Sequence, residues 1–297
     1  MSPDGSDGGQ SRFTTPATLA QNTAVTEEAQ KTSEQDAPAA DAAASPLIFE
    51  QPLNERIRTF LHLDFLYNQA LYHNEMQSQW GSRAAMTSLI DILAITTRSD
   101  VRSEVLKEIE RHLAQLGGFE DRPDVDMTRL RALINNLVRL RTALGAAGAA
   151  YLQPLRDSEF LAAIKHRSAI PGGTCEFDLP DYFFWLNQGA AERSVAFAEW
   201  LAMLRPLCDA VAEVLWLTRQ NGVSRKEIAV GGTFAINFDR DAPLQLLRIC
   251  LPADGGIYPE ISGSHHRCSV RFLSWNGLTA RPTQAPGDVP FQLITCA

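Results

Sequence analysis

The spacing of apolar residues changes once along this chain, near Arg225, and that change limits the fold more than any other feature. From Asn54 to about Gln220, apolar side chains recur at intervals of three and four, the spacing of amphipathic helices. After that they alternate with polar or small residues, the spacing of half-buried strands. This order predicts an α+β fold, with an N-terminal helical domain and a C-terminal antiparallel β-rich domain.

The helical region divides at its glycines, prolines and capping residues. Asn54 is placed to cap the first helix, and Gly117-Gly118 ends the third. Pro206 lies inside the longest apolar stretch and predicts a break or kink there, so this stretch is divided into two helices. The expected helices are Asn54–His73, Ala84–Thr97, Asp100–Leu116, Asp126–Leu144, Ser158–Arg167, Tyr182–Leu186 and two within Ala190–Gln220.

The β-rich region is predicted to contain four strands and to be completed by two earlier segments. The first strand is Ile228–Phe238, with a bulge at Gly231-Gly232. The others are Leu244–Leu251, His265–Phe272 and Val289–Thr295, and the earlier segments are Leu47–Gln51 and residues 174–178. The predicted domains are therefore residues 46–220, mainly helical, and residues 221–297, β-rich.

Residues 1–45 differ in composition from the rest of the chain. They are rich in small and polar residues, and they cannot bury enough apolar surface to offset the entropy of ordering, so we predict a disordered tail. Their seven acids and two bases account for −5 of the net charge of −8. The remaining −3 argues against nucleic-acid binding, which depends on clustered positive charge.

No cofactor, metal site or catalytic group is expected. The five cysteines have no CxxC spacing, which predicts reduced, buried thiols in a cytoplasmic protein. His266 and Cys268 share a strand face, but His265 does not, and two ligands leave a zinc site unclosed. No stretch approaches the ~20 apolar residues that span a bilayer, so no membrane association is predicted. We therefore expect a protein that is not an enzyme.

Four sequence blocks occur in the order found in one known family. They are Phe49–Thr59, Glu104–Glu108, Ile170–Pro180, and Tyr258–Gly263 followed by Arg267, Arg271 and Phe272. From about residue 47 to its C-terminus, the chain resembles the ZapD family of cell-division proteins. The resemblance implies a cytoplasmic homodimer at midcell that binds the C-terminal tail of FtsZ through a basic surface and bundles FtsZ filaments, which stabilises the Z-ring. The alternative is a non-enzymatic scaffold of the same fold that binds another acidic peptide.

Three arginines of the β-rich region are candidates for partner binding. Arg267 and Arg271 share one face of an expected strand, about 13 Å apart at ~3.3 Å per residue. Guanidinium groups bind carboxylates in a forked geometry, so the two side chains suit an acidic peptide. Arg248 is predicted to join the same patch. The alternative for all three is a solvated outer face.

Four further candidates lie in the helical region. Arg98 and Arg102 flank a helix junction, where long side chains are exposed, and Arg98 matches a basic position of the family. Their alternative role is to complement a helix dipole. Arg56 and Arg58 lie on the first helix, where pairing with neighbouring acids is the alternative.

Two positions depart from the family pattern. The family more often has Arg where this chain has His62, and His where it has Phe183. Histidine is only partly charged near neutral pH, so a contact made by His62 would be weaker than one made by arginine. Both departures weaken the case for a helical contribution to binding. A basic helix, Asp126–Leu144, is expected to be a solvated face; it carries Arg129, Arg131, Arg139 and Arg141.

Overall fold

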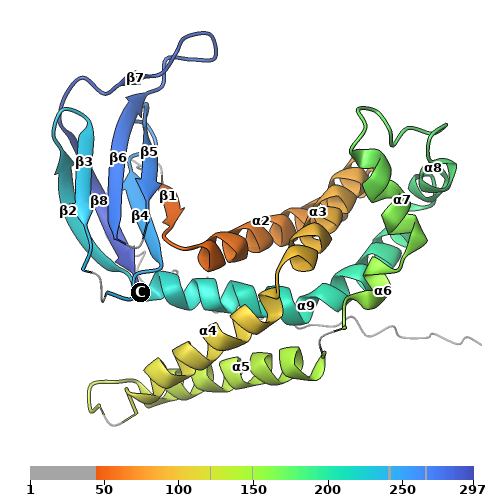
Figure 1. The fold of residues 1–297 in the computed structure, drawn as a ribbon, viewed down its shortest axis with the longest axis horizontal. Coiled ribbons are helices and arrows are strands. Elements are labelled where there is room, and N and C mark those ends of the chain that lie inside the picture. Colours follow the sequence, from red (N-terminus) through yellow and green to blue (C-terminus); the bar gives the residue numbers. More distant parts are fainter. Residues whose placement is uncertain (1–44, 121, 149, 240–241, 265) are drawn as a thin grey trace, which may run out of the picture. The chain divides into compact units, whose positions relative to one another are not determined.

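Helices give way to strands where the apolar spacing changes, between Gln220 and Val223 (Figure 1). The computed structural model describes residues 45–120, 122–148, 150–239, 242–264 and 266–297. The predicted disordered tail lies outside these residues, apart from Ser45. Residues Pro46–Ala297 form one compact unit. The predicted α+β class is confirmed, and the helical and β-rich regions are two parts of this unit.

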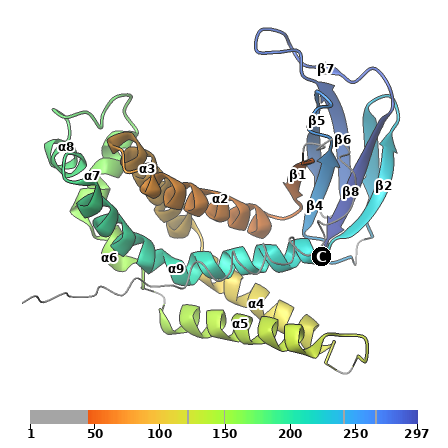
Figure 2. The ribbon, with the colours of Figure 1, turned by 180° about the vertical axis from the view of Figure 1, so that it is seen from behind.

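The helical part is built around two long helices, α2 and α9, which pack against each other. The Asn54 side chain accepts a hydrogen bond from the Ile57 amide and caps α2, as predicted. Figure 2 shows α9 extending from the end that holds α6–α8 to the sheets. The helices are α2 (Glu55–Glu75), α3 (Gln79–Arg98), α4 (Val101–Gly117), α5 (Met127–Ala146), α6 (Gln153–Arg156), α7 (Glu159–Ser168), α8 (Pro180–Leu186) and α9 (Ala190–Gln220).

The predicted break at Pro206 is wrong, because α9 continues through it. Proline removes one helical hydrogen bond, and the carbonyl that loses its donor is that of Ala202, an exposed residue that water can reach. Leu204, Leu207 and Cys208 are buried on both sides of the proline. Burial of this continuous apolar face outweighs the local cost of the proline.

The β-rich part contains two antiparallel sheets. The first has the order β1-β4-β8-β2, and the second has the order β3-β6-β5, with β7 paired to β6. Leu47 of β1 pairs with Leu251 of β4, so the prediction that Leu47–Gln51 joins a sheet is confirmed. The strands are β1 (Leu47–Pro52), β2 (Val223–Ala229), β3 (Thr233–Asn237), β4 (Leu246–Leu251), β5 (Ile257–Gly263), β6 (Arg267–Ser274), β7 (Thr283–Gln284) and β8 (Val289–Cys296).

The predicted strand Ile228–Phe238 is two strands that belong to different sheets. Gly231 and Gly232 have φ angles of 56° and 75° and form the turn between β2 and β3. Residues other than glycine rarely adopt this left-handed conformation, so the glycine pair marks a reversal of the chain rather than a bulge.

The predicted strand at residues 174–178 is also wrong, because this segment forms turns. The Cys175 thiol donates a hydrogen bond to Oδ2 of Asp178 at 3.3 Å, which closes the turn locally. The Thr174 carbonyl accepts a hydrogen bond from Arg83 of α3, so the segment is fastened to the helical part instead of to a sheet.

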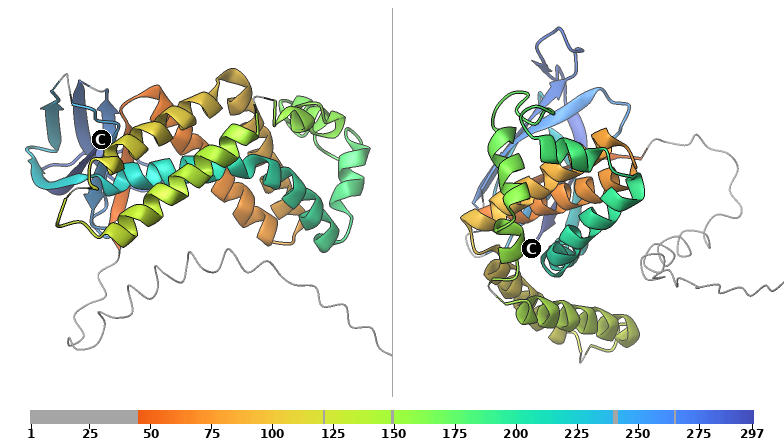
Figure 3. Two further views of the ribbon diagram at one scale, coloured as in Figure 1. Left: turned by 90° about the horizontal axis from the view of Figure 1, so that it is seen from below. Right: turned by 90° about the vertical axis from the view of Figure 1, so that its right-hand side faces the viewer.

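The two sheets and the helices form layers. Leu247 and Ile249 of the first sheet pack in one core with Val270 and Phe272 of the second, while Leu246 packs into the helical core. The first sheet therefore packs against the second sheet on one face and, at β4, against the helices on the other, and the second sheet has an outer face open to solvent. Figure 3 shows α4 and α5 lying together against α9. All five cysteines are unpaired, and Cys208, Cys250, Cys268 and Cys296 are buried.

Candidate partner-binding surface

The outer face of the second sheet carries three rows of side chains that cross β3, β6 and β5. Within each row the residues are antiparallel partners, so their side chains project to the same side. The rows are Thr233–Arg271–Glu260, Ala235–Ser269–Ser262 and Asn237–Arg267. We call this face the outer sheet surface.

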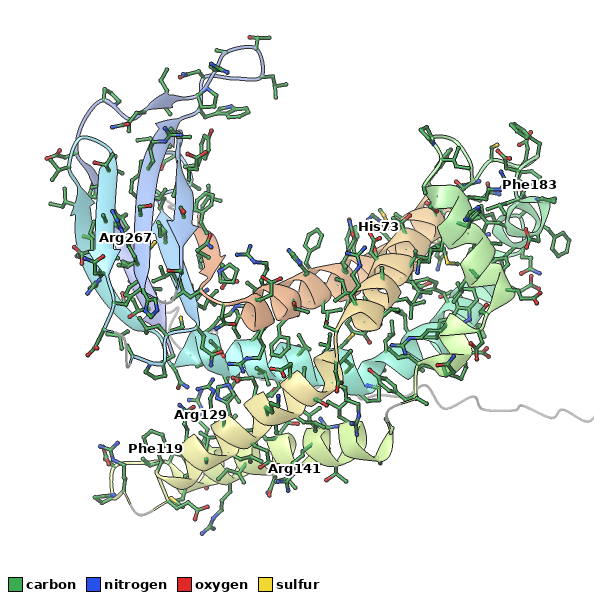
Figure 4. All side chains as sticks on the ribbon, viewed as in Figure 1. His73, Phe119, Arg129, Arg141, Phe183 and Arg267 are labelled. Carbon is green, nitrogen blue, oxygen red and sulfur yellow. The ribbon has the colours of Figure 1, made fainter. Side chains whose placement is uncertain are left out.

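Arg267 and Arg271 lie on β6 at the two ends of this surface. Both are exposed, and they alternate with the buried side chains of Cys268, Val270 and Phe272. The predicted division of the strand into an arginine face and an apolar face is confirmed. Figure 4 shows Arg267 on the sheets, distant from the helical end where Phe183 is labelled.

A hollow of about 440 Å³ lies over the first two rows. Ala235, Ser269 and Ser262, which have short side chains, line it beside the row of Arg271 and Glu260. At one end, Nε and Nη2 of Arg271 donate to Oε2 of Glu260 at 3.1 and 2.5 Å. The Arg267 side chain forms no hydrogen bond or ion pair with another described residue.

Glu260 is not among the residues that the sequence predicts for this surface. β5 contains Pro259, which lacks the amide that donates a hydrogen bond in a sheet. A proline at this position argues against a strand, so the sequence does not predict β5. The only sequence signal is the block Tyr258–Gly263, which points to the family and not to a pairing with Arg271.

Arg248 does not join this patch, and that prediction is wrong. It lies on the helix-facing side of the first sheet, where its Nε is 3.0 Å from Oε1 of Glu50. Arg219 of α9 binds both oxygens of the same carboxylate at 2.8 Å. Arg248 therefore helps to join the first sheet to α9. The two stacked sheets lie between Arg248 and Arg271.

Arg56 belongs to a buried carboxylate cluster, which consists of Arg56, Glu108, Arg111 and Gln245. Glu108 is only 2% exposed, and its oxygens lie 2.9 Å from Nη2 of Arg56, 2.8 Å from Nε of Arg111 and 3.1 Å from Nε2 of Gln245. Burial opposes the charged form, but the hydrogen bonds from Gln245 and Arg111 and the charges of Arg111 and Arg56 prevail, and the pKa of Glu108 is lowered. These contacts give Arg56 a structural role in joining α2, α4 and the segment before β4.

His112 lies beside this cluster on α4 and is 1% exposed. Burial, together with the charge of Arg111, lowers the pKa of its imidazole to about 4. The side chain is therefore neutral at physiological pH and acts as part of the packed interior.

Arg102 caps a helix. Its Nε and Nη2 donate to the carbonyls of Leu144 and Gly145 at 3.0 Å, at the C-terminus of α5. A cation at this position satisfies terminal carbonyls and complements the helix dipole, which is the alternative role predicted for this residue. The capped helix is α5, to which Arg102 does not belong.

Two helical candidates remain exposed. Arg98 is the last residue of α3, and its side chain has no hydrogen-bond or ion-pair partner among the described residues. Arg58 pairs with Glu55 at 3.3 Å and is 44% exposed. The structure does not bring either side chain onto the outer sheet surface.

The two residues that depart from the family pattern are also exposed, and so are arginines of the basic helix α5. His62 is exposed on α2, and Phe183 is exposed on α8. On α5, Arg139 donates to Asn136, and Arg141 pairs with Glu110 of α4 at 3.0 Å (Figure 4). The remaining arginines of this helix, Arg129 and Arg131, are exposed, which fits the predicted solvated face.

Within the described residues, no group of three or more His, Cys, Asp or Glu side chains is arranged to hold a metal ion. His265 lies outside those residues. No helix in the described part of the chain has both the length and the apolar character needed to cross a bilayer.

Comparison with known proteins identifies relatives along most of the chain. The model of the ZapD family, described as a cell division protein, matches residues 61–271. The Cell division protein ZapD of Methylococcus capsulatus is 38% identical over 252 residues, which cover 84% of this chain and 98% of the relative. The protein of the same name from Janthinobacterium sp. is 36% identical over 251 residues, which cover 84% and 99%. This chain therefore belongs to the ZapD family of cell division proteins.

Proposed function

We propose that the protein binds the C-terminal tail of FtsZ on the outer sheet surface and, as a homodimer, cross-links FtsZ filaments at midcell in the cytoplasm. The observation that carries the proposal is the placement of Arg267 and Arg271 at the two ends of one sheet face, with short side chains between them and Arg271 lining a hollow. This activity requires no cofactor and no covalent chemistry. Arg98 and Arg58 remain secondary candidates for contact with the partner.

The geometry suits an extended acidic peptide. Arg267 and Arg271 are four positions apart on the strand, about 13 Å at ~3.3 Å per residue, so carboxylates at a similar spacing on a peptide meet both arginines. The short side chains between them allow the peptide backbone to approach the sheet. Because the two guanidinium groups are solvent-exposed, the attraction should speed association and weaken as salt increases.

Cross-linking needs two such surfaces in one particle, and a second surface supports self-association. Trp80, Phe177, Phe183 and Phe184 are 79%, 83%, 42% and 70% exposed. We call them the distal aromatic surface. Arg83 of α3, the helix that carries Trp80, contacts the other two elements. It lies over the ring of Tyr182 on α8, 5.1 Å from its centroid, and it donates to the carbonyl of Thr174, which begins the turn that carries Phe177.

A second copy of this chain is the occupant that we propose for the distal aromatic surface. Soluble monomers rarely expose large contiguous apolar patches, and aromatic residues are enriched in interfaces between subunits. Figure 4 places Phe183 far from Arg267, so association at this end leaves both outer sheet surfaces free. A particle with two tail-binding surfaces converts weak contacts into avid cross-links.

Co-sedimentation with FtsZ polymers at low and high salt tests tail binding. We expect the wild-type protein to pellet with filaments, and Arg271→Glu to pellet much less while remaining folded. The matched control is Arg205→Glu, because Arg205 is 55% exposed and paired with a carboxylate, as Arg271 is at 54%. Equal pelleting of the two variants would refute the surface assignment. If the wild-type protein pellets equally with intact FtsZ and with FtsZ that lacks its tail, the proposed binding to the tail is refuted. Binding to another acidic partner then remains as the alternative function.

Sedimentation velocity tests self-association. The double variant Trp80→Ser, Phe184→Ser should shift the protein to monomer, bind an isolated FtsZ tail peptide as the wild type does, and fail to bundle filaments. Val223→Ser, at a side chain that is 69% exposed on β2, is the control for loss of exposed apolar surface. A double variant that remains dimeric contradicts the assignment of the interface.

A further inference from the structure

Glu260 occupies part of the surface that an acidic partner would need. It lies on β5 directly opposite Arg271 and lines the same hollow. Its Oε2 accepts from both Nε and Nη2 of Arg271, so one edge of the guanidinium fork is already bound to a carboxylate. The side chains of Arg271 and Glu260 are 54% and 60% exposed, so solvent and ligands can reach the pair.

The other end of the surface lacks such a carboxylate. The β3 partner of Arg267 is Asn237, and the Arg267 side chain has no hydrogen-bond or ion-pair partner among the described residues. Within the described part of the chain, two arginines on one strand face therefore differ: Arg267 is available, and Arg271 is occupied.

We infer that Glu260 is an internal competitor, which an acidic peptide must displace from Arg271 in order to bind the outer sheet surface. This inference rests on the proposed function. A guanidinium edge binds one carboxylate in its best geometry, so the Glu260 carboxylate and a peptide carboxylate compete for it. Glu260 also repels an incoming acidic group. It thereby lowers the affinity of the surface and favours partners that carry enough negative charge to displace it.

An exposed ion pair is readily exchanged. Pairs of this kind contribute little in water, so we expect Glu260→Gln to tighten binding of an acidic peptide by roughly two- to fivefold. The gain should shrink as salt increases, because both the pairing and the repulsion are screened.

Fluorescence anisotropy with a labelled FtsZ tail peptide tests the inference. Glu260→Gln should bind two- to fivefold more tightly than wild type. Glu110→Gln is the matched control, because Glu110 is 58% exposed and pairs with Arg141 at 3.0 Å, and this variant should bind as wild type does. In an Arg271→Gln background, the gain from Glu260→Gln should shrink to the part that repulsion alone provides, since no guanidinium remains to be released.

The outcomes separate the inference from the proposed function. If Arg271→Gln weakens binding and Glu260→Gln leaves it unchanged, the surface is correct and the competitor role is refuted. A gain that persists undiminished in the Arg271→Gln background also refutes competition and indicates general repulsion alone. Failure of the wild-type protein to bind the peptide at any salt concentration overturns the proposed function. A peptide in which Asn and Gln replace its acids should show no gain with Glu260→Gln.

Discussion

Arg56 with Glu108 and Arg271 with Glu260 are the same two residue types in two settings. Glu108 is 2% exposed and accepts from Arg111 and Gln245 as well as pairing with Arg56. Glu260 is 60% exposed, and Arg271 is its partner. A buried carboxylate needs several donors to offset its loss of hydration, whereas an exposed one is already solvated by water.

The difference indicates which arginines are available for binding. An arginine that neutralises a buried carboxylate cannot leave it without exposing an unpaired charge to a low dielectric. An arginine in an exposed pair can exchange one carboxylate for another at little cost in free energy. Burial of the acid, more than exposure of the arginine, therefore separates structural arginines from candidate binding arginines in this protein.

Neutralising the two acids tests this comparison most strongly. Glu108→Gln should lower the free energy of unfolding by about 3 kcal/mol, because it leaves the charges of Arg56 and Arg111 without a buried counter-ion. Glu260→Gln should change it by less than about 0.5 kcal/mol. Urea denaturation followed by circular dichroism measures both values. Similar losses in the two variants would contradict the distinction between a buried, structural carboxylate and an exposed, exchangeable one.

Low pH should destabilise the region of the buried carboxylate cluster through its neighbour His112. Its pKa falls from 6.5 to about 4 on folding, so between these values the unfolded chain binds a proton that the folded chain does not. Stability is therefore lost as the pH falls through this window, by about 2 kcal/mol between pH 7 and pH 5. Urea denaturation at pH 7, 6 and 5 should show this loss reduced in His112→Gln. His62→Gln, at an exposed position, should retain it, and an unchanged slope in His112→Gln would contradict the assignment.

The sequence could predict features that depend on local periodicity. The alternation of Arg267 and Arg271 with buried Cys268 and Val270 follows from the period of a strand, and the cap of α2 follows from Asn54. Both features require only neighbouring residues, so both were predicted correctly.

The features that were missed depend on residues distant in sequence. Arg56 and Arg58 are equivalent in the local sequence of one helix, and they differ in the structure because Glu108 pairs with Arg56 only. Arg248 looks like a neighbour of Arg271 until its strand proves to lie in another sheet. Pro206 predicts a break only where packing does not hold the helix together. In each case a tertiary contact decided between two structures that the local sequence allowed.

The smallest predicted effect is the difference in peptide affinity lost when each of the two arginines of the outer sheet surface is replaced. Arg267→Gln should weaken binding of the FtsZ tail peptide about fivefold, whereas Arg271→Gln should weaken it only about two- to threefold, because Glu260 already neutralises part of the Arg271 charge. In a Glu260→Gln background the Arg271 effect should rise to about fivefold and equal that of Arg267. Anisotropy titrations of the five proteins at one salt concentration provide the comparison. A larger effect of Arg271 in the wild-type background would show that its pairing with Glu260 does not limit its availability, and exposure alone would then suffice to identify binding arginines.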